Sequence, residues 1–187
     1  MIKSLILDFD GVITESVGIK AEAFSNLYKK YGNDIQRKIL DHHYSNGGMS
    51  RYDKFRFYHE EFLGVTLTDS MMKNLSNRFS KIVLGKIINV PYVNGALDFL
   101  NLYYNTYNLF ISTGTPKTEI DLIIKERKID HYFLKVYGSP MSKVTHVHQI
   151  LSKFNLKREE TIFVGDSLED FNAAKSTGLK FVARIHD

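Results

Sequence analysis

The second half of the chain alternates between short apolar runs and stretches with helical periodicity, and this alternation limits the possible folds more than any other feature. Four short runs rich in β-branched and aromatic residues are expected to be strands: 107–113, 132–137, 161–164 and 180–184. Between the second and third runs, Val144, Val147 and Ile150 recur at helical spacing. A further apolar run at 2–7 is expected to be a strand as well. Short apolar strands separated by helices predict an α/β fold, with a parallel sheet covered on both faces.

Residues 15–85 lack this alternation and are expected to be helical throughout. Apolar residues there define three helical faces: Ile19, Ala23, Phe24, Leu27, Tyr28 and Tyr31; Phe55, Tyr58, His59 and Phe62; Met71, Met72, Leu75, Phe79 and Ile82. We expect these side chains to form the core of a helical bundle rather than a ligand site. The sequence therefore predicts a sheet-based core, residues 1–14 and 86–187, interrupted by an all-helical cap at 15–85.

The first predicted strand ends in two acidic residues. Asp8 and Asp10 follow the apolar run directly, and Gly11 then breaks the strand. Two carboxylates at the end of a buried strand repel each other and lose hydration, so a nearby cation or a chemical role usually compensates. An acidic helix cap or a solvated turn is the structural alternative for this short motif alone.

Polar residues follow four of the predicted strands: Asp8 and Asp10, then Thr113, then Lys143, then Asp166 and Asp170. Taken singly, these could be turn residues, an exposed first-turn lysine and an acid on a helix face. In a parallel sheet, however, the carboxyl ends of the strands meet at one edge, where α/β folds bind ligands. Carboxylates at that density favour a hard divalent cation, and Mg²⁺ fits best. No histidine occurs in these motifs, so a zinc site is not expected.

Phosphoryl transfer would use every member of this set. A carboxylate can attack phosphorus and form an aspartyl-phosphate, which divides one difficult step into two. A second acid two residues further on can protonate the leaving oxygen and later activate water. A hydroxyl, backbone amides and a lysine can hold the phosphoryl oxygens while Mg²⁺ neutralises the remaining charge.

The complete ordered set resembles the haloacid dehalogenase-like superfamily, in its branch with a helical cap after the first strand. The resemblance implies a Rossmann-like core, with Asp8 as the nucleophile and Asp10 as the acid/base in the motif Asp8-Phe9-Asp10-Gly11. Within Ile111-Ser112-Thr113-Gly114-Thr115, Thr113 is aligned with the phosphate-binding hydroxyl, and Ser112 is the alternative by one residue.

The same resemblance implies roles for the remaining residues. Lys143 and Gly114 are expected to bind the phosphoryl group, and Thr113 and Lys143 are also expected to be catalytic. Asp166 is expected to bind Mg²⁺, supported by Asp170, and the full set of candidate metal ligands is Asp8, Asp10, Asp166 and Asp170.

Membership of this superfamily leaves the reaction open, and the sequence bears on four alternatives to a phosphatase. Asp10 argues against a dehalogenase, which lacks an acid there. A phosphonate-cleaving enzyme would need a Schiff-base lysine in the cap, but Lys20, the candidate, is expected to be an exposed helix lysine. A non-catalytic phospholigand-binding protein would be expected to lose Asp8 or Asp166.

The strongest alternative is a sugar-phosphate mutase. The stretch Gly48-Met49-Ser50-Arg51 resembles the Gly-x-Ser-Arg loop of the β-phosphoglucomutase group, whose arginine binds a distal phosphate. Arg51 is thus either a substrate-binding residue or the first residue of a solvated helix capped by Ser50. Lys20 stands where that group has a histidine, so hydrolysis is preferred. Other polar residues of the cap indicate an anionic substrate: Asn46, Gly47, Tyr52, Lys54 and Arg56.

Composition removes several other classes of function. The 187 residues include no cysteine, which excludes disulfides, thiolate catalysis and cysteine-based zinc sites. The net charge of +4 comes from scattered basic residues, so a nucleic-acid partner is not expected. No apolar run has the length of a membrane span and no export signal is evident, so we expect a cytoplasmic protein without a membrane partner. The sequence does not indicate an oligomeric state.

Overall fold

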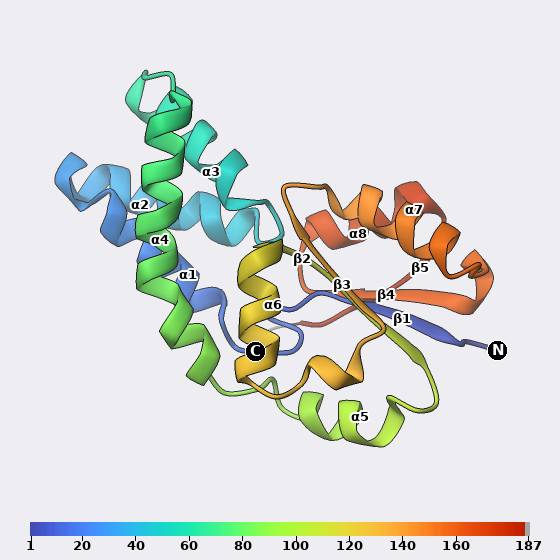
Figure 1. The fold of residues 1–187 in the computed structure, drawn as a ribbon. Coiled ribbons are helices and arrows are strands. Elements are labelled where there is room, and N and C mark those ends of the chain that lie inside the picture. The colour runs from blue at the N-terminus through green and yellow to red at the C-terminus, as the bar shows by residue number, and fades with distance from the viewer. Residues whose placement is uncertain (186–187) are drawn as a thin grey trace.

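The centre of the computed structural model, which describes residues 1–185, is a five-stranded parallel sheet in the order β3-β2-β1-β4-β5 (Figure 1). The strands are β1 (Ser4–Leu7), β2 (Asn108–Pro116), β3 (Lys135–Ser139), β4 (Thr161–Gly165) and β5 (Lys180–Ala183). Leu7 lies opposite Ile111 of β2 and Val164 of β4, so the three central strands are in register near their carboxyl ends. The predicted α/β fold is confirmed.

Helices cover both faces of the sheet, as the strand pattern predicted (Figure 1). One face carries α5 (Ala96–Tyr103) and α6 (Lys117–Glu126), and the other carries α7 (Lys143–Lys153) and α8 (Leu168–Thr177). Successive side chains of β1 point to opposite faces of the sheet, so each face has apolar residues against which helices pack. Leu5 and Leu7 belong to the apolar cluster that includes α5 and α6, while Ile6 belongs to the cluster with α7 and α8.

Two predicted strands differ from the observed ones by three residues at one end. The strand expected at 132–137 is β3, which begins at Lys135 because a short 3₁₀ helix, η3 (Asp130–Tyr132), occupies the preceding residues. The strand expected to stop at Gly114 continues to Pro116, which lies opposite Ser139 of β3. Two further 3₁₀ helices are η1 (Lys29–Tyr31) and η4 (Arg158–Glu160).

Four helices form an insertion between β1 and β2: α1 (Val17–Leu27), α2 (Asn33–Ser45), α3 (Arg51–Phe57) and α4 (Asp69–Asn89), with a π-helical turn η2 (Tyr58–Phe62) after α3. Buried aromatic rings hold it together, and Phe24 lies 4.4 Å from Phe79 and 5.4 Å from Phe55 between ring centroids. We call this insertion the cap. The domain limit expected at residue 85 falls inside α4, which continues to Asn89. No helix within residues 1–185 has the length and apolar character to cross a membrane.

The two segments that connect the cap to the sheet lie side by side. The backbone N–H of Glu15 donates to the carbonyl of Pro91 at 3.0 Å, and the N–H of Val93 donates to the carbonyl of Ile13 at 3.0 Å. An isolated antiparallel bridge pairs Thr14 with Tyr92. The chain therefore enters and leaves the cap through one hydrogen-bonded pair of linkers.

Candidate active site

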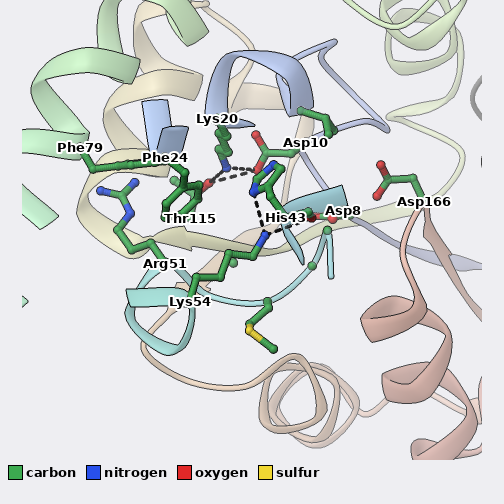
Figure 2. Close-up of a pocket in the computed structure, with 15 residues that line it drawn as sticks. Asp8, Asp10, Lys20, Phe24, His43, Arg51, Lys54, Phe79, Thr115 and Asp166 are labelled. Carbon is green, nitrogen blue, oxygen red and sulfur yellow. Dashed lines mark hydrogen bonds and ion pairs between the residues drawn. The ribbon is translucent and has the colours of Figure 1, made fainter. Parts of the chain in front are cut away.

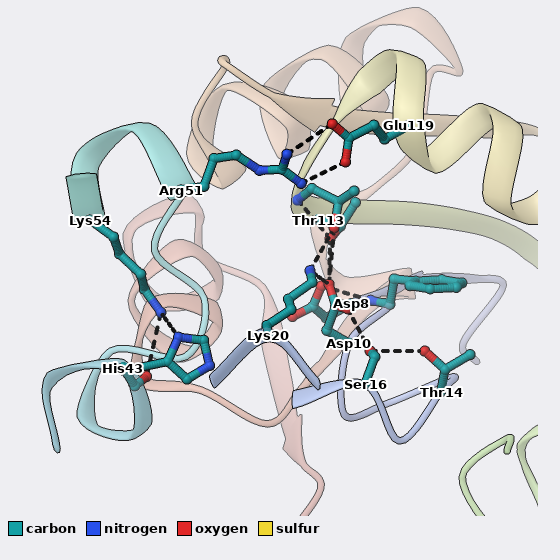
Figure 3. Close-up of polar contacts among 12 residues, drawn as sticks. Asp8, Asp10, Thr14, Ser16, Lys20, His43, Arg51, Lys54, Thr113 and Glu119 are labelled. Atoms are coloured by element: carbon teal, nitrogen blue, oxygen red, sulfur yellow. Dashed lines mark hydrogen bonds and ion pairs between the residues drawn. The ribbon is translucent and has the colours of Figure 1, made fainter. Parts of the chain in front are cut away.

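Asp8 leaves the centre of the sheet at the carboxyl end of β1. The backbone N–H of Phe9 donates to Asp8 Oδ1 at 2.6 Å, and Asp8 itself is only 3% exposed. The chain then turns sharply, because Gly11 adopts a φ of +78°, which a residue with a side chain rarely adopts. The turn after Asp10 lets Ser16 and Lys20 return to its carboxylate, which lies near Asp8 at the same edge of the sheet (Figure 3).

A buried lysine joins two of the predicted acids. Lys143, at the start of α7, places its Nζ 2.8 Å from Asp8 Oδ2 and 2.5 Å from Asp170 Oδ1. Burial alone would lower the pKa of Lys143, but Asp8 and Asp170 outweigh this effect and raise its pKa, so the side chain is an ammonium. The other oxygen of Asp170 accepts hydrogen bonds from the backbone and hydroxyl of Ser167, which caps α8.

Three acids form a compact carboxylate group. Oxygen atoms of Asp8, Asp166 and Asp170 lie within 4.8 Å of one another. Burial raises the pKa of Asp8 well above its usual value; Lys143 opposes this effect, and the charges of Asp170, Asp166 and Asp10 add to it. One lysine therefore does not compensate these carboxylates, and a hard divalent cation with oxygen ligands fits the donor set. The predicted fourth ligand, the carboxylate of Asp10, is not part of this group.

The carboxylate of Asp10 has different partners. It lies 2.5 Å from Ser16 Oγ and 2.5 Å from Lys20 Nζ, and it also accepts from Thr115 Oγ1 at 3.1 Å and Thr113 Oγ1 at 3.3 Å (Figure 3). Burial opposes ionisation, but Lys20 and the hydroxyl donors outweigh it and hold the pKa of Asp10 below its usual value. The interpretation of Lys20 as an exposed helix lysine is wrong, because its side chain is 14% exposed and paired with Asp10.

The two candidate hydroxyls of β2 point in opposite directions. Thr113 Oγ1 faces Asp10, whereas Ser112 Oγ is bonded to His146 Nδ1 at 2.9 Å beneath α7. Successive side chains of a strand alternate between the faces, so Thr113 and Thr115 share the face that Ser112 does not. The sequence analysis did not single out Thr115, although this two-residue period was a signal for it.

A narrow cavity of about 40 Å³ lies between the cap and this edge of the sheet (Figure 2). From the sheet side it is lined by Asp8, Asp10, Gly114, Thr115 and Asp166. The cap backbone approaches the sheet closely here: a Cβ at Gly114 would lie 3.0 Å from the carbonyl oxygen of Gly48, and a Cβ at Gly48 would lie 2.5 Å from Ser167 Oγ. Glycine at both positions allows the cap to close directly over Asp8.

Arg51 lies in the cavity wall but is bound by the protein itself. Its guanidinium forms two hydrogen bonds with Glu119 of α6, at 2.8 and 2.6 Å, and a third with Ser80 at 2.8 Å. The side chain also covers the ring of Phe79 at 4.6 Å. Arg51 is 4% exposed, so the alternative of a solvated helix residue is wrong, although Ser50 does cap the helix as predicted. The role of Arg51 in substrate binding stays a prediction.

Two further cap residues line the same cavity. Lys54 Nζ lies 2.9 Å from His43 Nδ1 and 3.4 Å from the carbonyl oxygen of His43 (Figure 2). The sequence indicated Lys54 only as one of several polar residues of the cap, and it gave no expectation for His43. The spacing of Arg51 and Lys54, three residues apart on α3, was a signal that both share one helix face.

Sequence comparisons place this arrangement among known proteins. The family described as "Haloacid dehalogenase-like hydrolase" matches residues 5–184. A phosphoglycolate phosphatase from Mannheimia succiniciproducens is 29% identical over 126 residues, which cover 64% of this chain and 56% of that relative. The match thus spans about half the length of that protein. A phosphorylated carbohydrates phosphatase from Thermotoga maritima is 21% identical over 187 residues, covering 95% of this chain and 82% of the relative.

Solved structures share the fold. A hydrolase from Pseudomonas syringae superposes with a TM-score of 0.78 at 18% identity, covering 97% of this chain and 84% of the other. The likeness therefore includes the cap as well as the sheet.

Proposed function

The chain belongs to the haloacid dehalogenase-like hydrolase family, and we propose that it is a Mg²⁺-dependent phosphatase that hydrolyses a small phosphorylated metabolite through an aspartyl-phosphate on Asp8. One observation carries the proposal. Asp8 lies at the end of the central strand, bonded to Lys143 and within the carboxylate group that it forms with Asp166 and Asp170. A lone buried acid would be costly, whereas a nucleophile beside a lysine and a cation site is suited to a dianionic ester.

The donor set supports Mg²⁺. Asp8 and Asp166 would hold the ion, while Asp170, whose two oxygens accept from Lys143 and Ser167, would fix the position of Lys143 beside it. When bound, the ion would neutralise charge on the phosphoryl oxygens and on the carboxylates.

In the first step, an oxygen of Asp8 attacks phosphorus, a new P–O bond forms, and the bond to the leaving oxygen breaks. Lys143 orients the Asp8 carboxylate and offers a positive charge to the phosphoryl oxygens. Thr113, on the same side as Asp10, is available to donate to a phosphoryl oxygen. In this step Asp10 acts in its protonated form and gives its proton to the leaving oxygen, and Lys20, Ser16 and Thr115 stabilise the carboxylate that results.

In the second step, water attacks the phosphorus of the aspartyl-phosphate, Asp10 accepts the water proton, and the bond between phosphorus and the Asp8 oxygen breaks. Lys20, Ser16 and Thr115 favour the ionised form of Asp10, which suits this role as a base. The two steps return Asp8 to its starting state and release inorganic phosphate.

Mutase chemistry would use the same Asp8 but pass the phosphoryl group to a second sugar hydroxyl. Arg51, the residue that would hold a distal phosphate, is instead bound at both terminal nitrogens by Glu119 and Ser80. This arrangement supports hydrolysis. Relatives are named for phosphoglycolate and for phosphorylated carbohydrates, so an ester of each kind belongs in the first substrate panel.

The test is phosphate release from a panel of metabolite phosphomonoesters with Mg²⁺ and with chelator. We expect release that requires Mg²⁺, and steady release of phosphate from a doubly phosphorylated hexose without interconversion of its monophosphates. Fast interconversion with little free phosphate would establish the mutase instead. Tight phosphate-ester binding without any turnover would favour the non-catalytic binding protein.

A further inference from the structure

Four basic side chains surround the cavity or lie directly behind it, and three of them have acidic partners. Lys143 pairs with Asp8 and Asp170, Lys20 pairs with Asp10, and Arg51 pairs with Glu119. Within residues 1–185, Lys54 forms no ion pair with a carboxylate, although it is only 1% exposed. A fully buried ammonium without an acid is rare, because burial removes its hydration.

Only part of the hydrogen-bonding capacity of Lys54 is used by groups of the protein. An ammonium has three donors, and the structure provides two acceptors for Lys54, both on His43. Burial, together with the charges of Lys54 and Lys20, lowers the pKa of His43 to about 3, so His43 is neutral and accepts through Nδ1. The ring of Phe24, whose centroid lies 5.6 Å from Lys54 Nζ, attracts the charge but accepts no conventional hydrogen bond, so one donor of Lys54 is left for a group that enters the cavity.

The surroundings of Lys54 also favour an incoming anion. Burial and the charge of Lys20 lower the pKa of Lys54 to about 7, with Lys143 adding to the effect and Asp10 opposing it. A negative group beside Lys54 would offset the free-energy cost of burying its ammonium, whereas a neutral hydroxyl would offset much less of that cost.

The position of Lys54 indicates which part of a substrate would reach it. Asp8 lines the cavity from the sheet and Lys54 lines it from α3 of the cap (Figure 2). Because the leaving oxygen departs roughly in line with the attacking Asp8 oxygen, on the far side of phosphorus, it would face the cap. The cavity is only about 40 Å³ in this closed arrangement, which favours a leaving group of a few heavy atoms.

We propose that Lys54, held by His43, is a specificity-determining residue that binds a second anionic group on a short leaving group, either a carboxylate or a second phosphate. This inference rests on the proposed phosphatase function and adds the substrate class: small phosphomonoesters that carry a further negative charge on the same short carbon chain.

The experiment compares three esters of one two-carbon skeleton. Phosphoglycolate carries a carboxylate on the leaving group, ethane-1,2-diol bisphosphate carries a second phosphate, and 2-hydroxyethyl phosphate carries a neutral hydroxyl. Their kcat/KM values are measured with Mg²⁺ for the wild type, Lys54→Met, Lys54→Arg and Lys73→Met. Lys73→Met is the matched control, because Lys73 is exposed on α4 of the same cap.

We expect the wild type to prefer one or both anionic esters to the neutral ester. Lys54→Met should reduce kcat/KM for the preferred anionic ester by about 10- to 100-fold, the scale of one charge-assisted hydrogen bond, with little change for the neutral ester. Lys54→Arg should restore part of the loss, and Lys73→Met should match the wild type. The ester with the higher kcat/KM of the two anionic esters then shows whether Lys54 binds a carboxylate or a phosphate.

Equal losses for charged and neutral esters in Lys54→Met would overturn the inference and make Lys54 structural, and so would a wild type that does not discriminate by charge. Neither result would contradict the proposed phosphatase activity. Absence of phosphate release from all three esters and from the wider metabolite panel would instead refute the proposed function. Thermal unfolding of each variant establishes that the kinetic changes come from folded protein.

Discussion

The two sides of the candidate active site hold their charges in different ways. On the sheet side, Lys143 is fixed between Asp8 and Asp170, and every polar group follows the end of a strand. On the cap side, charged residues come from three helices and depend on contacts that the helices make with each other and with α6. The sheet side is therefore organised for one reaction, to which the cap adds Lys20 beside Asp10. The other cap contacts, those of Arg51 and Lys54, can change without disturbing the group around Asp8.

The largest effect expected from this comparison is on catalysis at the sheet side. Asp8→Asn should reduce phosphate release by about 10,000-fold or more, because an amide oxygen does not form the aspartyl-phosphate. The measurement is steady-state release with Mg²⁺ for the best ester of the panel. Asp121→Asn, at an exposed acid of α6, is the matched control and should retain wild-type activity. Comparable activity in Asp8→Asn would remove Asp8 from the chemistry.

The next effect concerns stability on the same side. Lys143→Met leaves the buried carboxylates of Asp8 and Asp170 without a counter-charge, which should cost about 3–5 kcal/mol of unfolding free energy. Lys117→Met breaks an exposed ion pair with Asp121 and should cost about 0–1 kcal/mol. Urea unfolding measures both. Mg²⁺ should recover part of the loss in Lys143→Met. Equal stability of the two variants would contradict the buried pairing.

A smaller effect is expected where the cap meets the sheet side. Arg51→Met should cost about 1–3 kcal/mol, less than Lys143→Met, because the Glu119 side chain keeps 16% exposure and can regain some water. A double-mutant cycle with Glu119→Gln should show a coupling energy between the two positions. If Arg51→Met instead leaves stability unchanged and weakens only binding of the native ester, Arg51 is a substrate contact as the sequence predicted.

The smallest effect is a pH dependence from the cap side. Because the pKa of Lys54 is lowered to about 7, the folded state binds fewer protons than the unfolded state between pH 7 and the usual lysine range. The cost of a charged Lys54 is thus complete below about pH 7 and is relieved as the pH rises. Wild-type stability should increase by about 1 kcal/mol relative to Lys54→Met between pH 7 and 8. Parallel pH profiles of the two proteins would contradict the lowered pKa.

The difference between the two sides also explains what the sequence could predict. Strand ends of a parallel sheet converge by geometry, so Asp8, Lys143 and Asp166 could be placed at one edge from their order alone. Helices of a bundle can rotate about their axes and tilt, and the sequence does not fix which face looks into a cavity. Lys20 was therefore mistaken for an exposed residue, and the pairing of Lys54 with His43 was not foreseen.

Some errors arose from competition between local and tertiary contacts. Arg51 begins a helix capped by Ser50, which is the local pattern of a solvated terminus, yet Glu119 lies 68 residues away and buries it. The resemblance implied that Asp10 is a metal ligand; its carboxylate lies outside the group formed by Asp8, Asp166 and Asp170, and the role stays a prediction. The lysine and hydroxyls that occupy its carboxylate come from α1, its N-cap Ser16 and the end of β2, which only the fold brings together.

The paired linkers at Thr14 and Tyr92 have a consequence for how often the site is complete. Because the two linkers are bonded to each other, a cap that opened would rotate about them more readily than it would slide, and it would stay within reach of the sheet. Because the cap is tethered, its effective concentration at the sheet edge would be far above that of a separate binding partner. Each closure would return Lys20 to Asp10 and Lys54 to the cavity wall. The rate of turnover can then be limited by the ester that arrives rather than by reassembly of the enzyme.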